Sequence, residues 1–135
     1  MDQFPSQESM TAVMVRRVLI IEDCLEDALL LGLAFEDHAP EVQVEAISDG
    51  ATALAYVQSA EPPQVVVLDL HLPGQTGVEV LKQLQEVAGA VQVVCWSSHA
   101  HPKEVEAVLA CGAAYLEKPR EITGFGRLVQ TLLTL

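Results

Sequence analysis

The chain has 135 residues, of which half are hydrophobic, and a formal net charge of −12 at pH 7. The length is that of one domain, and the acidic charge disfavours nucleic acids and anionic membranes, which attract clustered Lys and Arg. No apolar run reaches the roughly 20 residues that span a bilayer, and the first ten residues do not resemble a signal peptide. We therefore expect a soluble, cytoplasmic protein whose partners are proteins or cations.

Short β-rich runs alternate with longer helical segments after residues 1–15, which we expect to form an N-terminal tail. The sequence predicts strands over residues 17–21, 42–46, 65–69, 91–96 and 113–116. It predicts helices over residues 28–38, 51–60, 78–85, 103–111 and 121–135. Asp49 is expected to cap the second helix and Gly112 to end the fourth. The uniformly apolar strands indicate a parallel sheet that is covered on both faces, which is a doubly wound α/β fold over residues 16–135.

Polar residues stand where these strands end. They are Glu22, Asp23, Asp69, Ser97 and Lys118. In doubly wound folds the carboxyl ends of the strands form the ligand site. Three carboxylates at one edge would repel each other unless a cation lay among them, and oxygen ligands of this kind suit Mg²⁺. Ser97 and Lys118 would supply donors to a phosphoryl group, and Asp69 could act as a nucleophile toward phosphorus, giving an acyl phosphate.

These residues resemble the receiver domain of two-component response regulators. The matching features are the pair Glu22-Asp23, Asp69 within DLHLPGQTG, Ser97, Tyr115, and the dipeptide Lys118-Pro119. The resemblance covers residues 17–135 and implies a flavodoxin-like receiver fold, with strand order 2-1-3-4-5 and five helices. It also implies that Asp69 accepts a phosphoryl group from a phosphohistidine of a sensor histidine kinase. Mg²⁺, or Mn²⁺ in its place, would be held by Glu22, Asp23, Asp69 and the backbone carbonyl of His71.

The resemblance further implies a switch. Ser97 would move toward the phosphoryl group, Tyr115 would turn inward, and a cis bond between Lys118 and Pro119 would aim the lysine at the site. The surface that changes would be the face made by the fourth helix, the fifth strand and the fifth helix, which we expect to support a homodimer. The candidate interface residues on the last helix are Ile122, Phe125, Leu128, Val129 and Leu132.

The first helix is expected to dock the kinase. Leu25, Leu29 and Leu33 form a stripe that we expect to pack on the sheet, and further apolar residues around the helix extend a possible interface. Because no output domain fits in this length, the signal is expected to leave by protein contact or by onward phosphotransfer, and we expect no separate turnover substrate. The segment from Ala34 to Val57 is similar to that of stand-alone regulators paired with bacterial phytochrome kinases.

Several other interpretations remain open. A degenerate receiver could act only as a phosphorylation-independent adaptor. A flavodoxin-like FMN protein would need a phosphate loop where EDCLED stands, and a haloacid dehalogenase-type phosphatase would need an acid at His71. His71, His99 and His101 could suggest a transition-metal site, but such a pattern in a polar loop is more often solvated. The three cysteines are widely spaced without a CxxC, so we expect reduced thiols.

Overall fold

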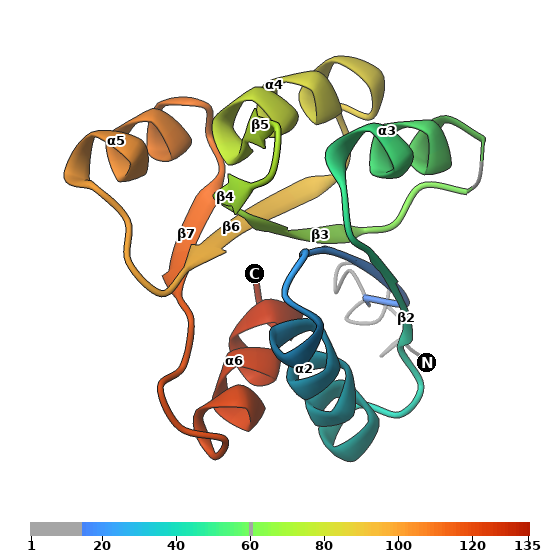
Figure 1. Ribbon diagram of the computed structural model, residues 1–135. Coiled ribbons are helices and arrows are strands. Elements are labelled where there is room, and N and C mark those ends of the chain that lie inside the picture. Colours follow the sequence, from blue (N-terminus) through green and yellow to red (C-terminus); the bar gives the residue numbers. More distant parts are fainter. Residues whose placement is uncertain (1–14, 60) are drawn as a thin grey trace, which may run out of the picture.

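A five-stranded parallel sheet forms the centre of the protein (Figure 1). The computed structural model describes residues 15–59 and 61–135, so the predicted tail lies outside the described residues except for Val15. The strands of the sheet are β1 (Arg17–Ile21), β2 (Gln43–Ile47), β3 (Val65–Asp69), β6 (Gln92–Ser97) and β7 (Ala114–Glu117). They pair in the order β2-β1-β3-β6-β7, which confirms the predicted order 2-1-3-4-5 for the five main strands.

Five helices cover the two faces of the sheet. Two of them, α2 (Leu25–His38) and α6 (Gly124–Leu133), pack together on one face (Figure 1). The opposite face carries α3 (Gly50–Ser59), α4 (Gly77–Val87) and α5 (Pro102–Ala110). The predicted doubly wound α/β fold is therefore confirmed. Among the described helices, none combines the length and the apolar character needed to cross a bilayer.

The central strand β3 contributes to two separate hydrophobic cores. All five of its residues are buried. Val65 and Val67 lie in the core under α2 and α6, whereas Val66 and Leu68 lie in the core under the other three helices. Successive side chains of a strand point to opposite faces, so both faces of β3 must be apolar. This arrangement explains the uniformly apolar run that the sequence shows before Asp69.

Local sequence signals fix several helix ends and turns. Asp49 Oδ1 accepts a hydrogen bond from the backbone N–H of Thr52 at 2.8 Å, so the predicted cap is present. Gly112 has a φ of 82° just after α5 and Gly74 a φ of 79°, a region that glycine enters without strain. Gly74 lies in the turn of a small hairpin made by β4 (His71–Leu72) and β5 (Gln75–Thr76). The sequence predicted only a turn here, because two-residue strands carry no periodic pattern.

The last helix is a core element rather than an exposed interface. Phe125, Leu128, Val129 and Leu132 are all buried between the sheet and α2, so their prediction as interface residues is wrong. The apolar face of α6 is needed to cover the sheet, so these four side chains are not available to a partner. Only Ile122, which precedes the helix, is exposed, at 73%.

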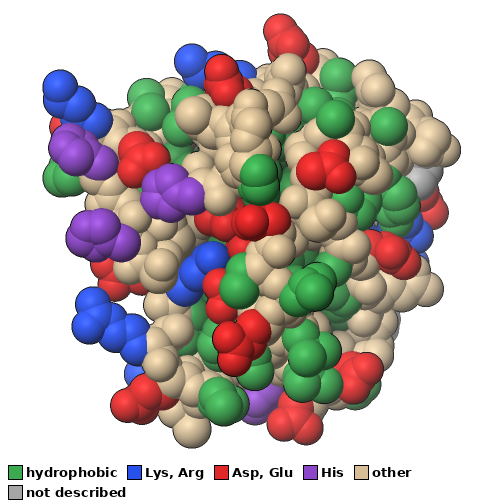
Figure 2. All heavy atoms as spheres, in the orientation of Figure 1, with side chains coloured by type: hydrophobic (Ala, Val, Ile, Leu, Met, Phe, Trp, Pro, Cys, Tyr) green, Lys and Arg blue, Asp and Glu red, His purple; other side chains and the backbone are tan. Residues whose placement is uncertain are grey.

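On the first helix, by contrast, residues that were predicted to be buried are exposed. Leu25, Leu29 and Leu33 were expected to pack on the sheet, yet they are exposed at 81%, 61% and 49%. The residues of α2 that reach the core are instead Leu31, Ala34 and Phe35. Apolar residues surround most of this helix, so its sequence alone does not decide which side turns inward. The result is an exposed leucine stripe, defined here as Leu25, Leu29 and Leu33, which contributes to the hydrophobic surface over α2 in Figure 2.

Candidate functional site

An acidic cluster lies at the carboxyl ends of β1 and β3. Glu22, Asp23 and Asp69 each offer one carboxylate oxygen, and these three oxygens lie within 4.8 Å of one another. Glu22 and Asp69 are buried, at 2% and 4% exposure, whereas Asp23 is exposed. The structure thus brings together three of the residues that the sequence nominated as metal ligands. Within the described ranges, no other group of three metal-ligating side chains meets this closely.

Backbone amides hold the two buried carboxylates in place. Glu22 Oε2 accepts a hydrogen bond from the N–H of Cys24 at 3.0 Å, and Asp69 Oδ1 accepts one from the N–H of His71 at 3.0 Å. Burial of the Glu22 carboxyl, together with its contact to Asp69, raises the pKa of Glu22 to about 7. The two carboxylates therefore repel each other at short range, and a cation between them would relieve the repulsion.

Lys118 supplies a positive charge to this cluster. Its Nζ lies 3.0 Å from Glu22 Oε1 and 3.7 Å from Asp69 Oδ2. It donates its shortest hydrogen bond, at 2.9 Å, to Oδ2 of Asp27. Burial disfavours the charged ammonium, but the hydrogen bonds to Asp27 and Glu22 outweigh it and raise the pKa of Lys118 above its ordinary value. Lys118 is therefore a charged partner of the cluster.

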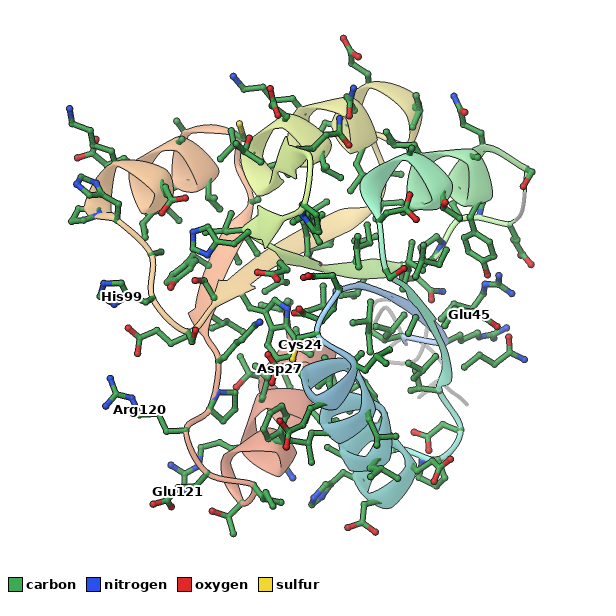
Figure 3. All side chains as sticks on the ribbon, in the orientation of Figure 1. Cys24, Asp27, Glu45, His99, Arg120 and Glu121 are labelled. Atoms are coloured by element: carbon green, nitrogen blue, oxygen red, sulfur yellow. The ribbon has the colours of Figure 1, made fainter. Side chains whose placement is uncertain are left out.

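Asp27 is a site residue that sequence reasoning missed. It lies in the first turn of α2, and Figure 3 labels it beside Cys24 at the start of that helix. The predicted helix began only at residue 28, so Asp27 was assigned to a loop. A usable signal was present, because Glu26 and Asp27 directly precede the predicted helix, and acidic residues are typical of the first turn of a helix.

Trp96 lies between Lys118 of the site and the hydrophobic core under α2 and α6. Lys118 Nζ lies 5.1 Å from the centroid of the indole ring, within the range of a cation–π contact. On the other side, Phe125 of α6 meets the indole edge to face, with the ring centroids 6.3 Å apart and the planes at 88°. Trp96 is fully buried in the core under α2 and α6. The indole therefore links the acidic cluster to that core.

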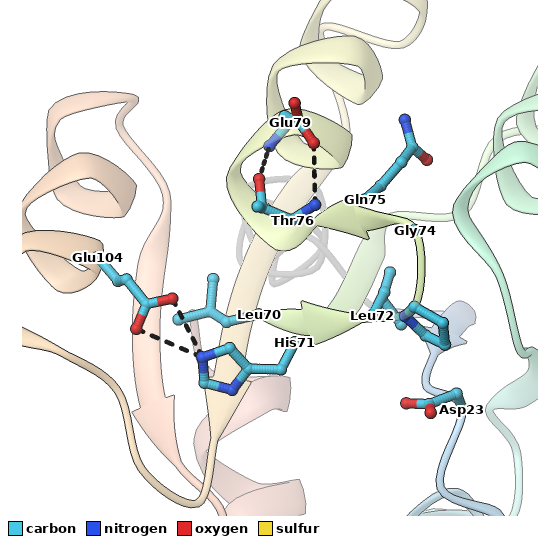
Figure 4. Close-up of a pocket in the computed structure, with 10 residues that line it drawn as sticks. Asp23, Leu70, His71, Leu72, Gly74, Gln75, Thr76, Glu79 and Glu104 are labelled. Carbon is cyan, nitrogen blue, oxygen red and sulfur yellow. Dashed lines mark hydrogen bonds and ion pairs between the residues drawn. The ribbon is translucent and has the colours of Figure 1, made fainter.

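Ser97, at the end of β6, is held by a polar network. Ser97 Oγ accepts a hydrogen bond from the N–H of His99 at 3.0 Å and lies 3.4 Å from His71 Nδ1. The other ring nitrogen of His71, Nε2, lies 3.1 and 3.3 Å from the two carboxylate oxygens of Glu104 (Figure 4). Ser97 is thus connected, through one imidazole, to the beginning of α5.

Tyr115, the other predicted switch residue, lies next to Ser97 on β7. The phenol is half-buried, and burial together with the charge of Glu117 raises its pKa, while a hydrogen bond with Ser97 acts in the opposite direction. The two predicted switch residues therefore lie on paired strands, β6 and β7, near the same end of the sheet.

The expected cis bond before Pro119 is not present. No peptide bond within the described residues is cis, so the bond between Lys118 and Pro119 is trans and this prediction is wrong. The trans isomer of an X–Pro bond is favoured by about 0.5–1 kcal/mol unless the surroundings select cis. Lys118 needs no such selection here, because its long side chain reaches the carboxylates while its own N–H donates to the carbonyl of Ser97 at 2.9 Å.

An open depression of about 610 Å³ lies beside the acidic cluster. The β4–β5 hairpin forms its floor, Asp23 stands at one edge and Glu104 at the other (Figure 4). Asp23, the exposed member of the cluster, is therefore reached from solvent through this depression.

Comparison with known proteins identifies the family. The family model described as the response regulator receiver domain matches residues 18–130. Sporulation initiation phosphotransferase F of Bacillus subtilis is 26% identical over 124 residues, which cover 91% of this chain and 98% of the relative. This chain spans only 26% and 22% of the length of two longer curated relatives that it also matches.

Solved structures show the same fold. The phosphorylated cyanobacterial phytochrome response regulator RcpA has a TM-score of 0.78 at 22% identity, covering 87% of this chain and 90% of RcpA. The Mn²⁺-bound form of response regulator Rcp1, a protein of Synechocystis, has a TM-score of 0.77 at 24% identity, covering 89% and 96%. Because the family model covers residues 18–130, the chain belongs to the response regulator receiver domain family and is a receiver domain of two-component signalling.

Proposed function

We propose that Asp69 accepts a phosphoryl group from a phosphohistidine of a sensor histidine kinase, in a reaction that depends on Mg²⁺. One observation carries this proposal: a carboxylate at the end of a fully buried strand lies among two other carboxylates and a lysine ammonium. A structural ion pair would need one carboxylate for one lysine. A surplus of negative charge at a strand end instead suits a site that takes up a cation and then a phosphoryl group.

The transfer would exchange one bond to phosphorus for another. An oxygen of the Asp69 carboxylate attacks phosphorus, and the P–N bond to the donor imidazole breaks. The electron pair of that bond stays on the imidazole nitrogen, which takes up a proton from water. Lys118 and the hydroxyl of Ser97 would donate hydrogen bonds to the phosphoryl oxygens as charge builds up on them.

The donor set of the cluster fits a small divalent cation. Glu22, Asp23 and Asp69 supply hard carboxylate oxygens, which suit Mg²⁺ or Mn²⁺, and the backbone carbonyl of His71 would complete the protein ligands. When bound, the ion supplies positive charge that offsets the charge of the phosphoryl oxygens. The Mn²⁺-bound form of Rcp1 supports this assignment by its likeness in fold.

The exposed leucine stripe of α2 is the proposed docking surface for the kinase. Its three leucines lie on the helix that starts directly beside Asp23, so a helical partner bound there could bring a phosphohistidine to the acidic cluster. The similarity in fold to the phytochrome response regulator RcpA favours a bacterial phytochrome as this kinase.

The first test is intact-mass analysis after incubation with acetyl phosphate, with and without Mg²⁺. The proposal expects one phosphoryl adduct on the native chain, no adduct without Mg²⁺, and none on Asp69→Asn. Beryllofluoride, followed by the fluorescence of Trp96, provides a second test for a protein that rejects acetyl phosphate as donor. If neither reagent produces an Asp69-dependent change, the phosphoacceptor proposal fails and the adaptor interpretation replaces it.

A further inference from the structure

Lys118 is paired with a residue outside the proposed metal-binding cluster. Its Nζ is 2.9 Å from Asp27 Oδ2 but 3.7 Å from Asp69 Oδ2, so the hydrogen bond goes to Asp27 and not to the phosphoacceptor. We propose that Asp27 is a positioning residue that holds Lys118 away from Asp69 before phosphorylation and keeps the ammonium paired while a metal ion binds. This inference rests on the proposed function, in which Lys118 later binds the phosphoryl group.

Asp27 is well placed to hold the lysine. It belongs to the first turn of α2, where the partial positive charge of a helix N-terminus stabilises a carboxylate. Its side chain is 29% exposed and that of Lys118 is 11% exposed, so the pair lies at the margin of the buried site. Asp27 is fixed to a helix, whereas Lys118 has a long flexible side chain. A change of partner must therefore be made by the lysine.

The ammonium and a divalent cation compete for the same two carboxylates, those of Glu22 and Asp69. Lys118 contacts Glu22 at 3.0 Å and lies near Asp69, and both residues are also proposed metal ligands. Two cations close together repel each other, so metal binding requires Lys118 to withdraw from these oxygens. Asp27 offers the withdrawn ammonium a negative partner outside the metal ligands. Asp27 should therefore favour metal binding.

The same contact should oppose the phosphorylated state. Once Asp69 carries a phosphoryl group, Lys118 has to leave Asp27 in order to reach the phosphoryl oxygens. The hydrogen bond to Asp27 is then lost, and its loss makes the phosphorylated state less favourable. Removal of Asp27 should consequently weaken metal binding and strengthen the response to a phosphoryl analogue. A residue that only supports the fold would change both in the same direction.

Trp96 makes the position of Lys118 measurable. It is the one tryptophan of the chain, and its ring centroid lies 5.1 Å from Lys118 Nζ. Movement of the ammonium off the indole face changes the electric field at the ring, so the fluorescence of Trp96 should respond when Lys118 changes partner.

The experiment compares Asp27→Asn with the native chain and with Glu26→Gln. Glu26 is an exposed neighbour in the same helical turn, so its substitution removes the same charge at a similar place in the chain and leaves Lys118 and Asp27 paired. The Mg²⁺ dissociation constant is measured by calorimetry. The beryllofluoride midpoint is then measured by Trp96 fluorescence at saturating Mg²⁺.

For Asp27→Asn we expect a roughly threefold weaker Mg²⁺ affinity and a roughly threefold lower beryllofluoride midpoint, the scale set by a partly exposed ion pair. Glu26→Gln should change both by less. Asp27→Ser, with circular dichroism as a check of folding, should repeat the Asp27→Asn result.

Two outcomes would overturn the inference: Asp27→Asn weakens or strengthens both Mg²⁺ binding and the beryllofluoride response, or Glu26→Gln changes them as much as Asp27→Asn does. A native chain that responds to beryllofluoride while Asp27→Asn behaves identically to it would overturn the inference alone. A native chain that never responds would overturn the proposed function as well.

Discussion

His71 joins Ser97 to Glu104: its Nδ1 lies 3.4 Å from Ser97 Oγ, and its Nε2 lies 3.1 Å from Glu104 Oε2. His71 follows the last residue of β3, Asp69, by two residues, and Glu104 belongs to the first turn of α5. One imidazole therefore connects the proposed phosphoryl-binding hydroxyl with a helix of the surface that is expected to change.

Loss of the contact between His71 and Glu104 should leave the Ser97 side chain free to move away from His71. In Glu104→Gln the charge that holds His71 is removed, yet glutamine still serves in the capping box at the start of α5. We expect a beryllofluoride midpoint lowered by roughly two- to fivefold and a stability change below about 1 kcal/mol, because the contact between His71 and Glu104 is partly exposed. Titration by Trp96 fluorescence checks the first expectation and urea unfolding the second. Glu106→Gln, an exposed position on the same helix, is the control. An unchanged midpoint in Glu104→Gln would contradict the role of the connection.

Gly77 should be required for the packing of α4 against the end of β3 and the residue after it, Leu70. A Cβ at this position would lie 2.5 Å from Leu70 Cα and 2.8 Å from the carbonyl oxygen of Asp69, both backbone atoms. Gly77→Ala is expected to lower the free energy of unfolding by about 1–3 kcal/mol, the usual range for overpacking. Urea unfolding measures the change.

Gly32→Ala provides the matched control for Gly77→Ala. Gly32 lies within α2, and an added Cβ there meets no atom within 4 Å. This substitution is expected to raise stability by up to about 1 kcal/mol, because alanine favours helix more than glycine does. Equal effects of the two substitutions would show that the close approach at Gly77 is unimportant.

The leucine stripe should matter for phosphotransfer and not for folding. Leu29 is 61% exposed, so Leu29→Gln is expected to change stability by less than about 0.5 kcal/mol. Phosphotransfer from a cognate kinase should slow by about tenfold if this leucine is buried at the docking interface, while phosphorylation by acetyl phosphate should not change. Leu109→Gln, at a leucine of α5 that is 56% exposed, should leave both rates unchanged. Equal rates of phosphotransfer from the kinase to Leu29→Gln and Leu109→Gln would show that the leucine stripe is not part of the docking surface.

Two of the three thiols, those of Cys24 and Cys95, should differ in reactivity. Cys24 is exposed and Cys95 is buried, and burial, with a smaller effect of Cys111, raises the pKa of Cys95 to about 12. A raised pKa lowers the fraction of reactive thiolate at pH 8. A disulfide reagent should therefore modify Cys24 rapidly in the native protein and Cys95 only after unfolding. Cys24→Ser should abolish the rapid phase, and rapid modification of Cys95 in this variant would contradict its burial.

The fold could be predicted to within a few residues because the three central strands, β1, β3 and β6, are largely apolar. The ranges predicted for β1 and β3 agree with the structure, and the other three main strands are displaced by one residue. Helix orientation was less predictable. Leucines surround most of α2, so the pattern allowed its stripe to be placed on the wrong side, and the apolar face of α6 was predicted to be an interface although the sheet requires it.

The sequence predicted the site residues that stand at the ends of strands. It did not predict contacts between residues that are far apart in the chain. Strand ends converge in any doubly wound fold, which is why Glu22, Asp23 and Asp69 were found together. Lys118 and Asp27 are 91 residues apart, and His71 and Glu104 are 33 apart. No local pattern links such pairs, because only the complete fold brings the start of α2 to Lys118, or His71 to the start of α5.

The packing of β6 side chains prevents this strand from shifting along β3. Leu68 pairs with Cys95 and Asp69 with Trp96, and these two neighbours on β6 face opposite cores. A slip of one residue would exchange the largest side chain of the protein with a small thiol and would disrupt both cores at once. The side chains of β6 therefore hold the strand in its register from both faces of the sheet. Any signal that starts at Asp69 must therefore travel through side chains and the segment after Ser97, around a sheet that stays still.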